Sequence, residues 1–272
     1  ETQNVDWSDP NIIAKANELA NGKDDLFDVV FTLASWVENN IEYDLNSITA
    51  DSSQPSSWVL ETKEGVCDEM TSLFIALSRS IGIPARFVTG VSYTTSDLFS
   101  EPWQAHGWAE VYFPKVGWVS FDPTFGEFGY VDVTHIKLAS SVDATNPSTR
   151  YEWTANNVEL NANELNISVE FSGFGNVVEN EFSLENVIHK DIINFGSYNL
   201  IKAIIKNEND FYTATRLMLA LPDEISIINA AKQTILLKPK EVKEVYWITK
   251  VSDRLQNRYT YDFPYLIYTE RN

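Results

Sequence analysis

Apolar residues in the first 80 positions recur at the spacing of amphipathic helices. The pattern predicts a helix beginning at Asp9 and Pro10, a second over about 25–40 and a third over 67–80. Asp9 is a typical N-cap and Pro10 a favoured first helical residue. The third helix ends at Gly82, because glycine adopts the left-handed conformation that closes helices.

After the third helix the hydrophobic period changes to two, which is typical of strands. Residues 86–93, 108–113 and 117–121 alternate between apolar and polar side chains, and a short turn joins the last two segments. The polar segment 44–57 reads as a loop. Helices followed by an antiparallel sheet indicate an α+β domain, which we place at residues 1–145.

The rest of the chain has a different pattern. A polar stretch over 140–150 is a plausible linker, and no helical period follows it. Many short strands separated by turns favour an all-β, immunoglobulin-like sandwich over 146–272. The candidate strands are 151–159, 165–171, 177–188, 198–206, 213–220, 224–228, 233–237, 241–250 and 259–269.

Composition narrows the classes of partner. Apolar residues make up 44% of the 272 positions and charged residues 22%, as in globular proteins. The net charge of −19 excludes duplex nucleic acid as a partner and disfavours anionic membrane surfaces. Residues 1–150 hold 22 acidic and 8 basic residues. This excess either serves solubility or attracts cationic substrates.

The start of the sequence and its composition suggest where the protein is located. The first residues, Glu1 to Gln3, include neither an initiator methionine nor a signal-peptide core. We therefore expect a mature fragment whose targeting segment has been removed. An acidic protein with a sandwich domain favours an extracellular or cell-surface location, and a membrane anchor could lie outside this sequence.

The single cysteine is the strongest candidate for chemistry. Cys67 stands at the start of the third predicted helix, where the helix dipole favours a thiolate. A thiol nucleophile needs a base and a group that orients the base. His106 begins one predicted strand and Asp122 ends the next, so antiparallel pairing brings the two side chains together.

The acidic neighbours of Cys67 work against its ionisation. Glu64, Asp68 and Glu69 flank the cysteine, and nearby carboxylates raise the pKa of a thiol. If these side chains face solvent, their effect is screened. We expect the helix dipole and a cationic His106 to prevail, which gives a thiolate–imidazolium pair.

Four segments also resemble the transglutaminase-like core, in the order that the family has them. They are Gly65-Val66-Cys67-Asp68-Glu69, the run Leu77 to Arg86, His106-Gly107-Trp108-Ala109-Glu110-Val111-Tyr112, and Gly117 to Thr124, within a match of about residues 25–140. The resemblance implies a papain-like fold with Cys67 as nucleophile, His106 as base and Asp122 as orienter. Gly107 stands where relatives commonly have alanine, a difference that we expect to matter little.

The family implies several functions. We favour a thiol enzyme of the cysteine peptidase or amidase class, acting on a protein or peptide substrate and needing no cofactor. A protein cross-linking transglutaminase, with glutamine as acyl donor and an amine as acceptor, is the first alternative. A binding or structural module without catalytic activity is the second, although the cysteine, histidine and aspartate are all present.

Other residues are candidates for supporting roles. Relatives use an upstream aromatic or amide side chain to bind the oxyanion, and Tyr43, Gln54 and Trp58 all precede the cysteine. Trp103 could line the groove for the acyl donor. We interpret His135 as structural, and no cluster has the spacing of a metal site.

Overall fold

The chain divides into two compact units. A computed structural model describes all residues except 46–52, 145–166, 171, 174, 176–180 and 270–272. Contacts group the chain into Glu1–Gly175 and Asn176–Asn272. The boundary predicted at residue 146 falls among the residues that are not described, so it stays a prediction. No helix in the described ranges is both long and apolar enough to cross a membrane.

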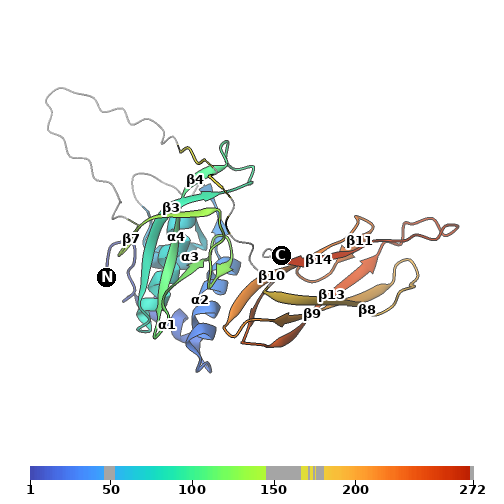
Figure 1. Cartoon of the computed structure of the whole chain (residues 1–272), viewed down its shortest axis with the longest axis horizontal. Coiled ribbons are helices and arrows are strands. Elements are labelled where there is room, and N and C mark those ends of the chain that lie inside the picture. The colour runs from blue at the N-terminus through green and yellow to red at the C-terminus, as the bar shows by residue number, and fades with distance from the viewer. Residues whose placement is uncertain (46–52, 145–166, 171, 174, 176–180, 270–272) are drawn as a thin grey trace. The chain divides into compact units, whose positions relative to one another are not determined.

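Four helices build one side of the first unit (Figure 1). The three predicted helices are confirmed, and α4 begins at Cys67 itself. The short helix α3, which begins at the end of the predicted 44–57 loop, was not expected. Their bounds are α1 (Pro10–Ala20), α2 (Leu26–Asn40), α3 (Ser56–Thr62) and α4 (Cys67–Ser80).

The first unit also contains a five-stranded antiparallel sheet, whose strands are ordered β6-β5-β4-β3-β7. The three predicted strands lie side by side at its centre, while β6 and β7 were not anticipated. A separate pair of short parallel strands, β1 and β2, leads into α4. The bounds are β1 (Glu42–Tyr43), β2 (Glu64–Gly65), β3 (Ala85–Tyr93), β4 (Trp103–Phe113), β5 (Gly117–Asp122), β6 (Glu127–Phe128) and β7 (His135–Ser141).

Aromatic side chains join the helices to the sheet. Helix α4 packs on β3 and β4. The Phe121 ring, on β5, is fully buried and lies 5.8 Å from Phe74 of α4 and 5.6 Å from Phe27 of α2, centroid to centroid. Because Phe121 directly precedes Asp122, the same packing fixes the end of β5 relative to α4.

The second unit contains two antiparallel sheets, ordered β11-β13-β9-β8 and β12-β10-β14. Both contribute to one apolar core, in which Trp247 is fully buried. The unit is therefore all-β within its described residues. The bounds are β8 (Phe182–Ile188), β9 (Tyr198–Asn207), β10 (Thr213–Ala220), β11 (Ile225–Ile227), β12 (Lys232–Leu237), β13 (Val242–Val251) and β14 (Leu266–Thr269).

The sequence located most of these strands but not all. The candidate strand 151–159 lies outside the described residues. The candidate strand 165–171 is wrong where it can be checked, because residues 167–170 are described and form no strand. The last candidate, 259–269, forms a strand only over Leu266–Thr269. The immunoglobulin-like topology stays a prediction.

We predict that Phe121→Ala lowers the free energy of unfolding of the first unit by about 3–5 kcal/mol, because it leaves a cavity among the packed rings. Val116→Ala is the control, since Val116 is 76% exposed in the turn before the same strand. Urea denaturation followed by fluorescence measures both. Equal effects of the two substitutions would contradict the assigned core.

Candidate active site

The first turn of α4 presents Cys67. The buried Glu69 side chain ties this turn down: one of its oxygens accepts the backbone N–H of Val66 at 3.1 Å, and the other accepts that of Gln54 at 3.1 Å. A carboxylate near a helix N-terminus is favourable because it satisfies free amides and complements the dipole. Glu69 thus holds the helix start in place.

The pairing of β4 with β5 brings His106 to Asp122. Ala109 lies opposite Phe121, so His106 projects beyond the end of the paired segment, towards the residue that follows Phe121. The His106 Nε2 and Asp122 Oδ2 atoms are 2.6 Å apart, and both side chains are buried. The structure therefore brings together the two residues that the register argument paired.

Both carboxylate oxygens of Asp122 accept hydrogen bonds within the site. Its Oδ1 accepts the backbone N–H groups of Thr124 at 2.8 Å and Phe125 at 3.1 Å. Its Oδ2 accepts from His106 and also faces Nε2 of His135 at 3.1 Å. Burial opposes ionisation, but the charges and hydrogen bonds of the two histidines outweigh it and hold the pKa of Asp122 well below its usual range.

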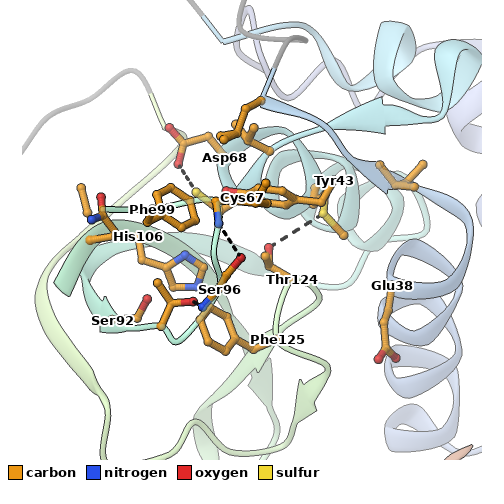
Figure 2. Close-up of a pocket in the computed structure, with 18 residues that line it drawn as sticks. Glu38, Tyr43, Cys67, Asp68, Ser92, Ser96, Phe99, His106, Thr124 and Phe125 are labelled. Carbon is orange, nitrogen blue, oxygen red and sulfur yellow. Dashed lines mark hydrogen bonds between the residues drawn. The ribbon is translucent and has the colours of Figure 1, made fainter. Parts of the chain in front are cut away.

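One pocket contains both Cys67 and His106 (Figure 2). It has a volume of about 690 Å³, within the usual range of ligand clefts. The Thr71 hydroxyl of α4 donates to the Gly107 carbonyl of β4 at 3.0 Å. The Gly107 backbone N–H in turn bonds the Cys67 sulfur. These contacts hold the cysteine beside the residue that follows His106.

The electrostatic environment of Cys67 disfavours a thiolate. Burial and the carboxylate of Asp68, whose Oδ1 lies 3.8 Å from Sγ, raise the pKa of the thiol well above its usual value. Asp68 is half-buried and Glu69 is buried, so solvent does not screen them as it screens the exposed Glu64. This environment works against the predicted thiolate–imidazolium pair, which stays a prediction.

Gly107 has a larger role than expected. A Cβ atom at this position would lie 2.3 Å from the Phe87 ring and 2.8 Å from Asp68 Oδ1. The expectation that glycine here matters little is therefore wrong. The missing side chain makes room for both the ring of β3 and the carboxylate beside Cys67.

The other predicted site residues are divided between the pocket and its surroundings. Tyr43 lines the pocket with Cys67. Burial, followed by the charges of Cys67 and Asp68, raises the pKa of its phenol, which therefore stays protonated. Gln54, Trp58 and Trp103 are not among the lining residues, and the Trp103 ring instead meets that of Tyr93 edge to face at 5.4 Å.

His135 lies closer to the site than the sequence indicated. Its side chain is fully buried, and its ring centroid is 5.4 Å from that of His106. Nδ1 faces Oδ1 of Asp132 at 3.0 Å, three residues earlier, and Oε2 of Glu127 at 3.7 Å. The Asp132–His135 spacing was the available signal, but nothing local relates it to Asp122.

Two groups of potential metal ligands occur in the described residues, and both include His135. The first adds His106 and Asp122, and the second adds Glu127 and Asp132. Direct hydrogen bonds already join His135 to Asp122 and to Asp132. We describe the cluster as a proton network on this basis, and the absence of a metal site stays a prediction.

We predict that Asp68→Asn lowers the pH at which Cys67 becomes reactive by about one unit, because it removes the nearest negative charge from the thiol. The measurement is the rate of alkylation by iodoacetamide from pH 4 to pH 10. Cys67 is the only cysteine, so the signal is unambiguous. Glu64→Gln, at an exposed carboxylate, should leave the profile unchanged. An unshifted profile for Asp68→Asn would refute this account of the thiol.

We also predict that Gly107→Ala destabilises the first unit by about 1–3 kcal/mol, since the new methyl group overlaps Phe87 and Asp68. Thermal unfolding measures the loss. Gly173→Ala is the matched control, because a Cβ at Gly173 meets nothing within 4 Å. Comparable stability of the two variants would show that the strand shifts freely.

Known proteins resemble the first unit. Residues 13–123 match the family model of the transglutaminase-like superfamily. An uncharacterized Bacillus subtilis protein, YebA, is 35% identical over 127 residues, which is 41% of this chain and 17% of YebA. A protein-glutamine gamma-glutamyltransferase of Pseudomonas aeruginosa is 32% identical over 73 residues, 25% of this chain and 11% of the enzyme. This chain thus spans less than a fifth of either relative.

Some solved structures are also similar to this chain. A cysteine protease candidate from Cytophaga hutchinsonii is 23% identical, with a TM-score of 0.46 over 54% of this chain and 46% of that one. Red sea bream transglutaminase is 12% identical, with a TM-score of 0.34 over 88% of this chain and 53% of that one. The family match itself rests on the sequence of the first unit. The likeness to the transglutaminase-like superfamily is thus shown for residues 13–123.

Proposed function

We propose that the first unit is a cysteine hydrolase that cleaves a peptide or carboxamide bond. Cys67 is the nucleophile, His106 the general base and acid, and Asp122 the group that orients His106. The buried 2.6 Å contact between Asp122 and His106, which lines the same pocket as Cys67, carries the proposal. An oriented imidazole beside a thiol is what acyl transfer requires.

The reaction begins from a neutral thiol. Because Nε2 of His106 is bonded to Asp122, Nδ1 is the ring nitrogen that takes part in the reaction. The thiol proton moves to Nδ1 as Sγ attacks the carbonyl carbon. The resulting imidazolium gives this proton to the leaving amine as the C–N bond breaks, which leaves an acyl-thioester. Water then attacks the thioester, loses its proton to His106, and releases a carboxylic acid while the thiol is restored.

Two donors are suited to the oxyanion. The backbone N–H of Cys67 belongs to the first turn of α4, where amides have no partner within the helix. The Tyr43 phenol stays protonated beside Cys67, so it can donate its O–H. Tyr43 is therefore our choice among the three upstream candidates. Preorganised donors of this kind stabilise the charge that develops in the transition state.

The pocket favours a substrate with apolar side chains near the scissile bond. Apolar side chains, among them Leu45, Leu98, Phe99 and Phe125, supply much of its lining. Figure 2 shows Phe99 and Phe125 among the residues that line the pocket with Cys67 and His106. A protein or peptide segment fits this lining better than a free polar amide does.

Transfer to an amine is the second candidate, and one observation favours it. Asp68 and Glu38 are among the residues that line the pocket, so the pocket carries acidic groups that would attract a cationic amine acceptor. The same acyl-thioester would then pass to the amine in place of water, with His106 taking the amine proton. An inactive module remains the third candidate, and the buried His106–Asp122 pair argues against it.

We propose that the second unit is a non-catalytic, immunoglobulin-like module. Two antiparallel sheets around one core support this proposal. Acidic composition is the support for an extracellular or cell-surface location and for a partner that is neither nucleic acid nor an anionic surface.

The test supplies casein with a fluorescent primary alkylamine and follows both cleavage and amine incorporation. We expect cleavage by the native chain, its loss in Cys67→Ala, and a fall on the order of 10⁴-fold in Asp122→Asn, where the imidazole loses its orienting charge. The controls are His189→Ala and Asp253→Asn at exposed positions of the second unit.

Each outcome separates two of the candidates. Incorporation of the amine without cleavage would favour the transferase and refute hydrolysis. Cleavage that survives Cys67→Ala would refute both thiol mechanisms. If neither product forms and the alkylation rate of Cys67 is the same in native protein and His106→Ala, the inactive module is the better reading.

A further inference from the structure

The oxygen of Asp122 that orients His106 is shared with a second imidazole. Oδ2 lies 2.6 Å from His106 Nε2 and 3.1 Å from His135 Nε2. The mechanism proposed above uses only the first of these rings. Burying a charged side chain costs free energy. The contact of the buried His135 ring with Asp122 therefore calls for an explanation.

The fold makes room for this second imidazole. His135 lies on β7, which is separated from β5 in the sheet by β3 and β4. Gly90, on β3, is the residue opposite His106. A Cβ at Gly90 would lie 2.5 Å from the Trp108 ring and 2.4 Å from the Ile136 carbonyl. Without a side chain there, Trp108 packs across β3 and meets the His135 ring edge to face at 5.3 Å.

The contacts of the His135 ring set its protonation. Nε2 faces Asp122, and Nδ1 faces Oδ1 of Asp132 at 3.0 Å. Ionised carboxylates only accept hydrogen bonds, so both ring nitrogens must carry a proton. Burial opposes this charge, but the two hydrogen bonds and the nearby acids raise the pKa of His135 to about 9. The ring is therefore an imidazolium at neutral pH.

Four titratable groups face this ring among the described residues. They are Asp122 at the end of β5, Glu127 on β6, Asp132 before β7 and His106 on β4. Burial and the charge of Asp132 raise the pKa of Glu127 to about 8, so it is mostly neutral at pH 7. Asp122 and Asp132 are the two anions that balance His135.

We propose that His135 is a positioning residue that acts through Asp122: held as an imidazolium between Asp122 and Asp132, it fixes the shared carboxylate that orients His106. The proposal rests on the function proposed above. The His135 ring lies 5.4 Å from that of His106, so its positive charge also acts on the site.

The test is the pH profile of Cys67 alkylation by iodoacetamide in the full chain. A positive charge near the site favours the Cys67 thiolate, so losing that charge moves the onset of reactivity to higher pH. His135→Gln can keep one N–H donor near Asp122 but removes the positive charge. We expect the onset of reactivity to move to higher pH by about one unit. His189→Gln, at an exposed histidine of the second unit, should leave the profile in place.

A second variant acts on the charge of His135 itself. Asp132→Asn removes one of the two carboxylates that hold the ring as an imidazolium and keeps an oxygen for the Thr134 backbone N–H, which Asp132 now accepts at 2.8 Å. The His135 ring should therefore lose its charge at a lower pH than in the native chain. A residue that only supports β7 would lower stability or rate in both variants without these shifts. Profiles that stay at the native position would overturn the proposal.

A readout independent of reactivity covers variants that fold poorly. The chain has three histidines, so ring signals from isotope-labelled histidine can be assigned with single variants. In the native chain the His135 signal should keep the imidazolium position from pH 5 to pH 8. A ring that becomes neutral within that range would also overturn the proposal.

These outcomes distinguish the proposal from the proposed function. If His106→Ala leaves the alkylation profile of Cys67 unchanged, the thiol–imidazole pair fails, and hydrolysis fails with it. If His106→Ala changes the profile but His135→Gln and Asp132→Asn do not, only the role of His135 is refuted.

Discussion

One buried carboxylate organises the first unit. Asp122 is inaccessible to solvent, so its charge is tolerable only because hydrogen-bond donors surround it. Two are the backbone N–H groups of Thr124 and Phe125 in the turn that follows β5, and two are imidazoles. The end of β5, the start of β4 and the start of β7 must therefore meet at one point.

The start of α4 is the second constraint, and it combines opposing influences on one sulfur. The helix dipole and the Gly107 backbone N–H favour a thiolate at Cys67, whereas burial and Asp68 disfavour it. Together they raise the pKa of the thiol, so the proposed chemistry begins from a thiol with an oriented base beside it. Gly107 is central to this balance, since a side chain there would displace the carboxylate.

The two units contribute differently to function. The family match covers part of the first unit, and that unit contains the pocket with its cysteine and histidine. The second unit has its own apolar core around Trp247, built from both of its sheets. A core of this kind allows a unit to fold without support from its neighbour.

Local sequence pattern is sufficient to predict part of the site. The helical period ending at residue 80 places the N-terminus of α4 at Cys67, and the short turn between β4 and β5 sets the register that joins His106 to Asp122. The contact of His135 with Asp122 and the burial of Asp68 are visible only in the folded chain. Both depend on segments distant in sequence, which meet where Gly90 and Gly107 leave space, and a periodic pattern does not report such space.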